Sequence, residues 1–244
     1  RQRALTRTCR SFAEGGSDKI ALMTEQSSSE VLDLDKLSVS VLGGTGDQGR
    51  GLARRLALAG HTVHIGSRSA ERAATVAEEL VAAESSSIDV RGLDNVAAAG
   101  AGDVVIVAVP WEGHRRLLEE LVEPLSGKIV VDCVNPLGFD KRGPFALEVE
   151  EGSAAQQAEK ILVHSRVTAA FHHVSAKVLL DPEVEEVDLD VLVLGEDRAA
   201  TDVVRALADR IPGVRGVFGG RLRNAHQVEA LTANLIAINR RYKT

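Results

Sequence analysis

Apolar residues recur along the chain in two alternating patterns. Short continuous apolar runs, typical of strands buried on both faces of a sheet, occupy residues 39–42, 62–65, 104–109, 129–134, 167–171 and 191–194. Between them, apolar positions repeat every three or four residues, as on one face of a helix, over residues 50–59, 70–83, 112–122, 154–162, 199–210 and 222–241. This alternation predicts a mostly parallel sheet with helices on both faces.

Two weaker segments extend the predicted sheet. Residues 88–90 are expected to complete its first half, and the segment GVRGVF, residues 213–218, to add a short strand before the last helix. We therefore predict an α/β fold, a Rossmann-like, doubly wound and mostly parallel sheet, in a domain over residues 38–218. A small helical C-terminal extension, residues 219–244, is expected to contribute to a substrate cleft or a subunit interface.

The N-terminal residues do not follow the alternating pattern, and we expect residues 1–37 to form a tail. Its later part, TEQSSSEVLDLD, is Ser-rich and then acidic, as in a solvated segment that leads into the first strand. The only methionine is Met23, so residues 1–22 are expected to lie outside the native coding sequence.

Composition narrows the class of protein. The chain has 244 residues, of which 44% are hydrophobic and 26% charged, enough for a globular core without disulfides. A net charge of -6 gives no electrostatic reason to expect nucleic acid or an anionic membrane as partner. No run has the roughly 18 apolar residues of a spanning helix, and Cys9 and Cys133 form no CxxC pair. We expect a soluble, cytoplasmic protein that acts on small molecules and holds no metal.

A glycine-rich segment follows the first predicted strand. Gly44-Thr45-Gly46-Asp47-Gln48-Gly49 matches GxGxxG and stands between a strand and a helix. In such motifs the first glycine allows a tight turn, the second lets the backbone approach a pyrophosphate, and the third lets the helix pack on the strand. The N–H groups of the following helix would then face the phosphates. The motif therefore predicts a dinucleotide site.

The end of the second strand indicates which dinucleotide binds. A site selective for NAD places Asp or Glu here to hold the ribose 2′-hydroxyl. This chain instead has Ser67 and Arg68, with Arg72 four residues further on. Two guanidinium groups and a hydroxyl are suited to a 2′-phosphate, so we predict NADP rather than NAD.

The segments LGGTGDQGRGLARRLALAGH, IGSRS, VAVPWEGH, FHHVSA and RNAHQVEALTANLIAINRR together resemble a known family. The chain is similar, over about residues 39–240, to the NADP-dependent reductases of coenzyme F-420, an 8-hydroxy-5-deazaflavin. The resemblance implies a hydride transfer between NADP(H) and this deazaflavin as co-substrate. Asp47 departs from the family pattern, because many relatives carry a neutral residue there.

The resemblance also implies roles for individual residues. The 2′-phosphate is expected at Ser67, Arg68 and Arg72, with Thr45, Gly46, Asp47 and Gln48 along the other phosphates. The positions expected to border the nicotinamide are Val109, Pro110 and Trp111. Those expected where the two rings meet are His172, Val174 and Ala176.

Hydride transfer requires that two ring carbons be held about 3 to 3.5 Å apart and kept from water, so few catalytic side chains are expected. We expect His172 to orient a ring, and His173, its neighbour on a predicted strand, to face away. His114 falls on a predicted helix, where packing or solvent contact explains it. A thiol in an apolar run, as at Cys133, is expected to be inert packing.

The deazaflavin side of the cleft is expected at a third strand end and on the last helix. Asn135, Pro136 and Leu137 follow the apolar run 129–134, and Leu231 lies in the apolar last helix. We expect direct hydride transfer with no bound flavin, in a homo-oligomer that is a dimer or a tetramer. Two alternatives stay open: an NADP-dependent dehydrogenase or imine reductase of the hydroxyacid or pyrroline-carboxylate type, and a non-catalytic NADP sensor.

Overall fold

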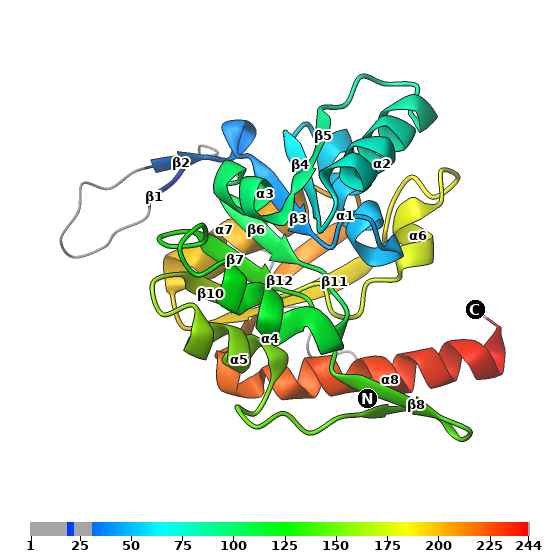
Figure 1. The fold of residues 1–244 in the computed structure, drawn as a ribbon. Coiled ribbons are helices and arrows are strands. Elements are labelled where there is room, and N and C mark those ends of the chain that lie inside the picture. The colour runs from blue at the N-terminus through cyan, green and yellow to red at the C-terminus, as the bar shows by residue number, and fades with distance from the viewer. Residues whose placement is uncertain (1–18, 22–30, 244) are drawn as a thin grey trace, which may run out of the picture.

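The core of the protein is an eight-stranded sheet in a computed structural model that describes residues 19–21 and 31–243 (Figure 1). Its strands lie in the order β12-β11-β10-β7-β6-β3-β4-β5. Their bounds are β3 Val39–Leu42, β4 Val63–Ser67, β5 Val90–Asp94, β6 Val104–Val107, β7 Ile129–Asp132, β10 Arg166–Ala169, β11 Leu189–Gly195 and β12 Val214–Gly220. Only the β10–β11 pair is antiparallel in this sheet, so the predicted mostly parallel, Rossmann-like sheet is confirmed.

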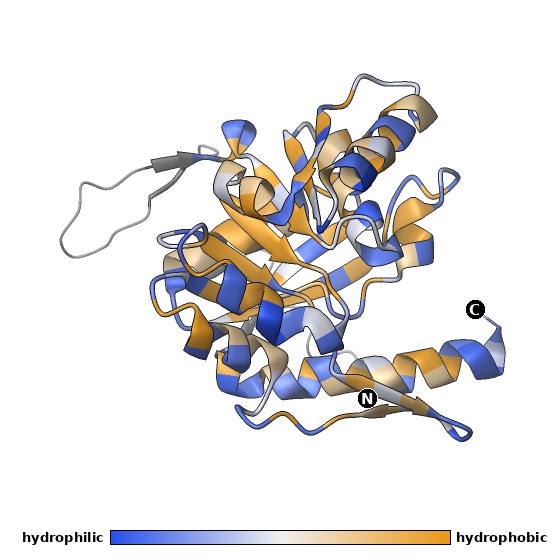
Figure 2. Ribbon diagram, viewed as in Figure 1, coloured by the Kyte–Doolittle hydropathy of each residue, from blue (hydrophilic) through white to orange (hydrophobic). Residues whose placement is uncertain are grey.

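Helices cover both faces of the sheet. They are α1 Asp47–Leu58, α2 Ala70–Ala83, α3 Asn95–Ala101, α4 Trp111–Glu120, α5 Ala154–Ile161, α6 Ala176–Leu180, α7 Arg198–Asp209 and α8 Ala225–Tyr242. One buried cluster joins the sheet to α1, α2, α6 and α7, and a second joins it to α3, α4, α5 and α8. The hydropathy colouring shows the apolar strands between these layers (Figure 2), as the continuous apolar runs predict.

The order of the strands places a crevice at one edge of the sheet. From β3 the chain proceeds outward through β4 to β5, then returns to β6 on the other side of β3. The helices that follow β3 and β6 therefore lie on opposite faces, and the loops after these strands separate at their carboxyl ends. In open α/β sheets ligands bind at this position.

The sequence patterns did not predict several short elements. Helix α3 is a seven-residue stretch of small side chains, and α6 has only five residues, so neither shows a helical repeat. The strands β8 (Leu137–Asp140) and β9 (Gly143–Ala146) form a hairpin outside the main sheet, beside α8. Strand β5 begins at the end of the predicted 88–90 run, and residues 222–224 are a 3-10 turn before α8.

The short helix α6 is held in place by buried arginines of α1. Arg55, with 3% of its surface exposed, donates through its guanidinium to backbone carbonyls at 2.7 to 3.4 Å. These acceptors are Val178, Leu179, Asp181, Val184 and Glu185. Because buried carbonyls need donors, this single side chain orders the turn that follows α6. None of the described helices is long and apolar enough to cross a membrane.

The predicted tail is described only in part. Residues 1–18 and 22–30, which include Cys9 and Met23, lie outside the described residues. Strands β1 (Lys19–Ala21) and β2 (Val31–Asp33) form an antiparallel pair separate from the main sheet. Leu34 and Leu37 are 5% and 2% exposed and belong to the main core. Core packing therefore begins a few residues before 38, and the domain boundaries stay predictions.

Candidate functional site

The glycine-rich turn between β3 and α1 is shaped by close contacts. Gly43 has a φ of +77°, and a Cβ there would lie 2.5 Å from the carbonyl oxygen of Ala108. A Cβ on Gly44 would lie 2.7 Å from Cγ2 of Ile65, and one on Gly49 would lie 2.6 Å from the carbonyl oxygen of Gly43. The left-handed turn is therefore at Gly43, one residue before the motif, while Gly44 and Gly49 are required by packing.

Gly46 differs from the other glycines of this turn. A Cβ there would meet nothing closer than the Gly43 oxygen at 3.5 Å, so packing does not demand glycine. Gly46 is the N-cap of α1, with no side chain bonded to the free N–H groups of the first turn. An open backbone at a helix N-terminus suits a phosphate group. Asp47, the first residue of α1, places its charge at the same helix end.

A cavity of about 560 Å³, here called the nucleotide cavity, opens beside this turn. It is lined by Gly43, Thr45, Gly46, Ser67, Arg68, Arg72, Asn95, Ala108, Val109, Pro110, Glu112, Gly113, Arg116, Leu117 and Glu120. Ser67 is buried, whereas Arg68 and Arg72 are exposed at the start of α2. On the α4 side, Nε of Arg116 lies 3.1 Å from Oε1 of Glu120, so that this carboxylate is paired. The cavity brings together the three residues predicted to read the 2′-phosphate.

Asn95 is a polar side chain of this cavity that the sequence did not single out. It begins α3 at the end of β5, and its Oδ1 is buried without a hydrogen-bond partner. The amide stands close to Gly66, where a Cβ would lie 3.1 Å from Oδ1. A buried amide oxygen without a donor is costly. Asn95 is therefore a candidate to accept a hydrogen bond from the adenosine half of a nucleotide.

A second cavity of about 420 Å³, here called the ring cavity, adjoins the first and shares Ala108 and Val109 with it. It is lined by Gln48, Ala108, Val109, Cys133, Val134, Asn135, His172, His173, Val174, Ser175, Ala176, Lys177, Thr232, Leu235, Ile236 and Asn239. Three strand ends and α8 thus contribute to it. Among these residues Lys177 is the single Lys or Arg, and none is Asp or Glu.

His172 is a buried titratable group of the ring cavity. It is 4% exposed, and neither ring nitrogen makes a hydrogen bond of ordinary geometry. Burial lowers the pKa of His172 to about 4, which keeps the imidazole neutral at neutral pH. Its backbone carbonyl accepts Nδ2 of Asn135 at 2.9 Å and Oγ1 of Thr232 at 3.1 Å. The residue is therefore fixed by its backbone while its ring stays available to a ligand.

The expectation that only one of the two adjacent histidines reaches the cleft is wrong. Strand β10 ends at Ala169, and Phe171 adopts a left-handed backbone with a φ of 64°. Because the chain has left the strand, the alternation of side chains no longer applies, and both His172 and His173 line the ring cavity. Nε2 of His173 also lies 2.9 Å from the carbonyl oxygen of Asp190.

The structure separates the predicted site residues into two groups. Those that line a cavity are Thr45, Gly46, Gln48, Ser67, Arg68, Arg72, Val109, Pro110, Asn135, His172, Val174 and Ala176. Those that do not are Gly44, Asp47, Gly49, Trp111, Pro136, Leu137 and Leu231. On α8 the lining is made instead by Thr232, Leu235, Ile236 and Asn239. The helical spacing of these four residues was visible in the sequence, but not which face of the helix meets the cavity.

Cys133 and the acidic groups offer no sign of nucleophilic or metal chemistry in the described part of the chain. Burial raises the pKa of the Cys133 thiol, whose Sγ lies 3.1 Å from the carbonyl oxygen of Val107. This agrees with an inert packing role. Across residues 31–243 no group of three or more His, Cys, Asp or Glu side chains is placed to hold a metal ion.

A family model and two relatives that match this chain are described as F420-dependent enzymes that act on NADP. Residues 38–136 match the family model described as "NADP oxidoreductase coenzyme F420-dependent". The F420-dependent NADP reductase of Methanothermobacter marburgensis is 40% identical over 208 residues, 83% of this chain and 92% of that protein. The F420-dependent NADP reductase of Methanocaldococcus jannaschii is 40% identical over 213 residues, 85% of this chain and 95% of that protein.

Solved structures match the fold. A crystal structure from Arthrobacter sp. FB24, described as a candidate F420-dependent NADP reductase, has a TM-score of 0.73 and 26% identity. The match covers 85% of this chain and 96% of that one. A pyrroline-5-carboxylate reductase from Coxiella burnetii has a TM-score of 0.57 and 16% identity, covering 85% of this chain and 67% of that one. The second likeness shows the fold alone.

Proposed function

Because the chain belongs to the family of F420-dependent NADP reductases, we propose that it transfers a hydride directly between NADP(H) and coenzyme F-420. The observation that carries this proposal is the pair of cavities that meet at Ala108 and Val109. The nucleotide cavity adjoins the glycine-rich turn between β3 and α1, and the ring cavity is lined mainly by apolar and neutral polar side chains. Such a pair can hold a nucleotide in one part and a second ring system against its nicotinamide in the other.

The residues of the nucleotide cavity fit NADP. The open backbone at Gly46 leaves room for a phosphate at the N-terminus of α1. Ser67, Arg68 and Arg72 supply a hydroxyl and two guanidinium groups for the 2′-phosphate. The segment from the end of β4 to the start of α2, residues 67–70, contains no Asp or Glu. We propose these residues, with Asn95, as the ligands of the adenosine half.

The residues of the ring cavity fit two stacked rings. When bound, the reduced nicotinamide supplies the hydride and the deazaflavin accepts it at C5. Neutral His172 gives a polar edge without introducing a charge next to the transferring hydride. Val109, Val174 and Leu235 provide apolar walls that exclude water. The protein's part in catalysis is therefore to orient the two rings and to keep the cavity dry.

A small carboxylate substrate is less well matched. Dehydrogenases and reductases of carboxylates commonly hold the substrate with an arginine fork, and the residues that line the ring cavity include none. The likeness to pyrroline-carboxylate reductases is one of fold, at 16% identity. A protein that only sensed NADP would not need the ring cavity.

An absorbance assay tests the proposal. Purified protein mixed with NADPH and oxidised coenzyme F-420 should bleach the band near 420 nm from which the coenzyme takes its name. NADH should give a much slower loss of the band, because it lacks the 2′-phosphate. Pyrroline-5-carboxylate in place of the deazaflavin serves as the control acceptor. Oxidation of NADPH by that acceptor, with the 420 nm band unchanged, would contradict the proposal and favour the imine reductase alternative.

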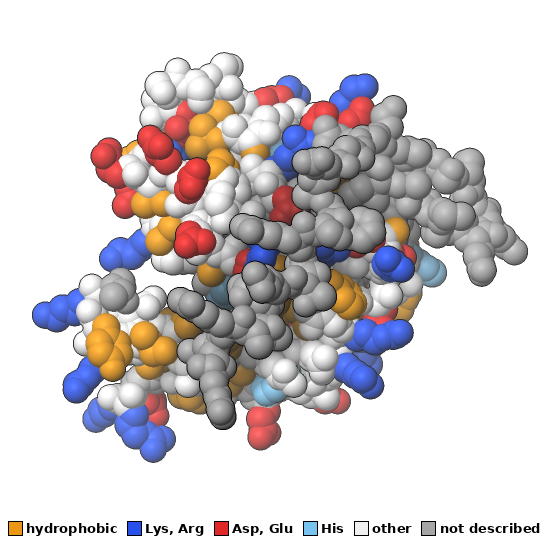
Figure 3. All heavy atoms as spheres, turned by 180° about the vertical axis from the view of Figure 1, so that it is seen from behind, with side chains coloured by type: hydrophobic (Ala, Val, Ile, Leu, Met, Phe, Trp, Pro, Cys, Tyr) orange, Lys and Arg blue, Asp and Glu red, His pale blue; other side chains and the backbone are white. Residues whose placement is uncertain are grey.

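The proposal extends to assembly and location. We propose a homo-oligomer, a dimer or a tetramer, because the C-terminal end of α8 projects past the body of the domain (Figure 1) and carries exposed apolar residues such as Ile238 and Tyr242. Figure 3 shows hydrophobic and basic side chains together at this end, in its lower left part. Light scattering on the purified protein measures the subunit number. The two cysteines without a disulfide framework support a cytoplasmic location.

A further inference from the structure

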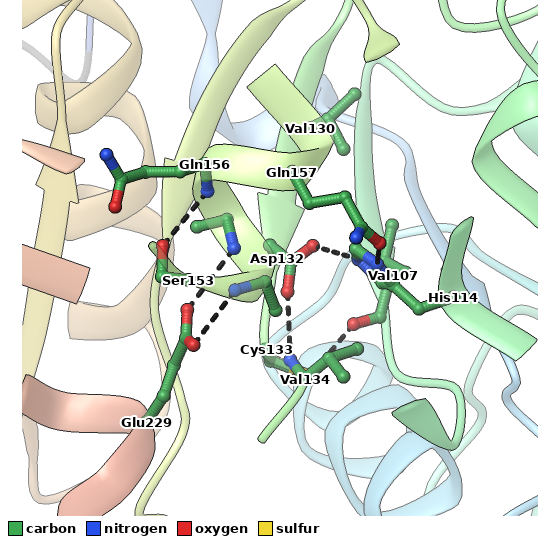
Figure 4. Close-up of polar contacts among 12 residues, drawn as sticks. Val107, His114, Val130, Asp132, Cys133, Val134, Ser153, Gln156, Gln157 and Glu229 are labelled. Atoms are coloured by element: carbon green, nitrogen blue, oxygen red, sulfur yellow. Dashed lines mark hydrogen bonds and ion pairs between the residues drawn. The ribbon is translucent and has the colours of Figure 1, made fainter. Parts of the chain in front are cut away.

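A buried ion pair joins α4 to β7, two elements that lie next to residues of the ring cavity. His114 lies in the first turns of α4, and its Nε2 is 2.6 Å from Oδ2 of Asp132, the last residue of β7 (Figure 4). Both side chains are 0% exposed. Oδ1 of the same carboxylate accepts the N–H of Val134 at 3.0 Å. The pair therefore ties the helix that follows Val109 to the segment that leads from β7 into the cavity.

The hydrogen bonds around His114 define its protonation. Oε1 of Gln157 lies 3.0 Å from Nδ1, and the amide cannot be reversed because its Nε2 donates to Oε2 of Glu151 at 3.1 Å. Nδ1 must therefore donate, while Nε2 faces a carboxylate oxygen. One further proton lies between Nε2 and Oδ2 of Asp132. Since imidazole is the stronger base and the carboxylate also accepts a backbone N–H, that proton belongs to His114.

The groups that face His114 support its positive charge. Burial alone would lower the pKa of His114, but the Asp132 carboxylate and the hydrogen bonds to Asp132 and Gln157 raise it overall. Glu229, on α8, adds a smaller effect in the same direction. Glu151, in the loop before α5, extends this network. Its Oε2 accepts from Gln157, and its Oε1 lies 2.5 Å from Nη2 of Arg115 on α4. Because these partners come from different elements, the network joins α4, β7 and α5 in one arrangement.

We propose that His114 and Asp132 are positioning residues for hydride transfer. Their ion pair sets the separation between Val109 on one wall of the ring cavity and Val134 and Asn135 on the other. This inference rests on the function proposed above, because the distance it controls is that between the two rings.

The contacts continue from the ion pair to the reacting region. Asp132 holds the N–H of Val134, and the next residue, Asn135, donates to the carbonyl of His172 at 2.9 Å. His172 faces the ring cavity. A change in the Asp132 carboxylate is therefore passed through two adjacent residues to the wall that would contact the deazaflavin. Displacements of about 1 Å at such positions slow reactions by about a hundredfold.

Trp111 provides a direct reporter of the ion pair. It is the single tryptophan of the chain, and its ring is stacked on that of His114 with centroids 5.5 Å apart and an interplanar angle of 30°. A protonated imidazole in contact with an indole quenches its fluorescence, whereas a neutral one does so weakly. The fluorescence of the protein without substrates therefore reports the charge of His114 independently of catalysis.

The kinetic test compares Asp132→Asn and His114→Gln with a matched control, His61→Asn. His61 is also buried, and its Nδ1 contacts the carbonyl oxygen of Leu37 at 3.1 Å, near the amino end of β4 and away from both cavities. We expect single-turnover hydride transfer to be slowed about ten- to a hundredfold in Asp132→Asn and in His114→Gln. The double variant should be no slower than the slower single one. NADPH affinity and the rate of the control should be unchanged.

The fluorescence test uses the same variants without substrates. At pH 7.5 Trp111 should be brighter in Asp132→Asn than in the wild type, with a quenching step at acidic pH that His114→Gln lacks. Unchanged hydride transfer in folded Asp132→Asn, or equal slowing in His61→Asn, overturns the proposal. If Asp132→Asn does not fold, His114→Gln decides alone, and unchanged hydride transfer in folded His114→Gln overturns the proposal. Wild-type protein that fails to reduce the deazaflavin overturns the proposed function, and the fluorescence still decides whether the ion pair exists.

Discussion

The turn between β3 and α1 offers a prediction that separates binding from packing. We compare Gly46→Ala with Gly49→Ala, two substitutions that add the same methyl group three residues apart. At Gly46 the new Cβ meets only the Gly43 oxygen, at 3.5 Å, whereas at Gly49 it would lie 2.6 Å from that oxygen and 2.7 Å from Cα of Gly44. The first substitution adds bulk to the nucleotide cavity, and the second forces the turn away from α1.

The expected magnitudes follow from these distances. Overpacking at Gly49 should cost about 1 to 3 kcal/mol of unfolding free energy. At about 2 to 4 °C per kcal/mol for a chain of this size, its melting temperature falls by roughly 2 to 12 °C. At Gly46 the loss of a favoured N-cap residue is offset by the lower entropy of the unfolded chain, so stability stays within about 1 kcal/mol. A methyl group where a phosphate approaches the backbone should weaken NADPH binding by about tenfold or more.

For each variant, calorimetry without ligand measures the melting temperature, and titration with NADPH measures the binding affinity. Gly49→Ala is the control for nonspecific damage to the turn. If Gly46→Ala binds NADPH as tightly as the wild type, the phosphates do not contact this backbone and the assignment of the motif is wrong. A large loss of stability in Gly46→Ala would instead show that the space beside it is not open.

Three further predictions follow from the site and the fold. Arg68→Ala should weaken NADPH binding by about tenfold and leave NADH binding unchanged. The expected loss is only about 1.5 kcal/mol because the Arg68 side chain is exposed. Equal losses of affinity for the two nucleotides would refute a contact with the 2′-phosphate. Burial raises the pKa of Glu229 from 4.5 to about 7, so the folded protein binds this proton more tightly than the unfolded chain. Its contribution to stability is therefore present below pH 4.5 and lost as the pH rises through about 7, and urea unfolding should show a weaker pH dependence in Glu229→Gln. A chain shortened to begin at Met23 should keep its melting temperature and activity, because among the described strands β1 pairs only with β2, outside the main sheet; a large loss would show that the contact between β1 and α7 stabilises the domain.

The sheet and its long helices could be predicted because their signals are local. A continuous apolar run such as 104–107 is compatible with a strand buried on both faces, and α2 shows a helical repeat over its full length. Helix α6 had no such signal, since its order depends on Arg55, more than a hundred residues earlier in the chain. The hairpin β8–β9 is similarly defined by its contact with α8 rather than by its own sequence.

The nucleotide half of the site was more predictable than the ring half. Ser67, Arg68 and Arg72 fall at a fixed distance from the glycine motif, so spacing alone brings them together. In the ring cavity, Leu231 was expected from the apolar character of α8, yet it is exposed, and Thr232 and Leu235 face the cavity instead. The orientation of α8 is set by long-range contacts such as the buried Glu229 carboxylate on the N–H groups of Ala154 and Ala155. No pattern within the helix contains that information.

The buried network shows a further limit of sequence patterns. His114 was assigned to packing or solvent contact because a lone histidine on a helix has no distinctive spacing to a partner. Its partner Asp132 ends the next strand of the sheet, and both become informative only when their separation of 2.6 Å is known. Charged residues in an apolar run are nonetheless unusual enough to mark a paired site.

Isotope transfer shows whether the hydride passes directly between the two bound rings. NADPH stereospecifically deuterated at the nicotinamide C4 is incubated with the protein and oxidised coenzyme F-420 in ordinary water, and the reduced coenzyme is examined by mass spectrometry and NMR. We expect one of the two hydrogens at C4 to be transferred, with its label retained at C5 of the deazaflavin. Loss of the label to water, or transfer that requires a flavin bound to the purified protein, would contradict direct hydride transfer.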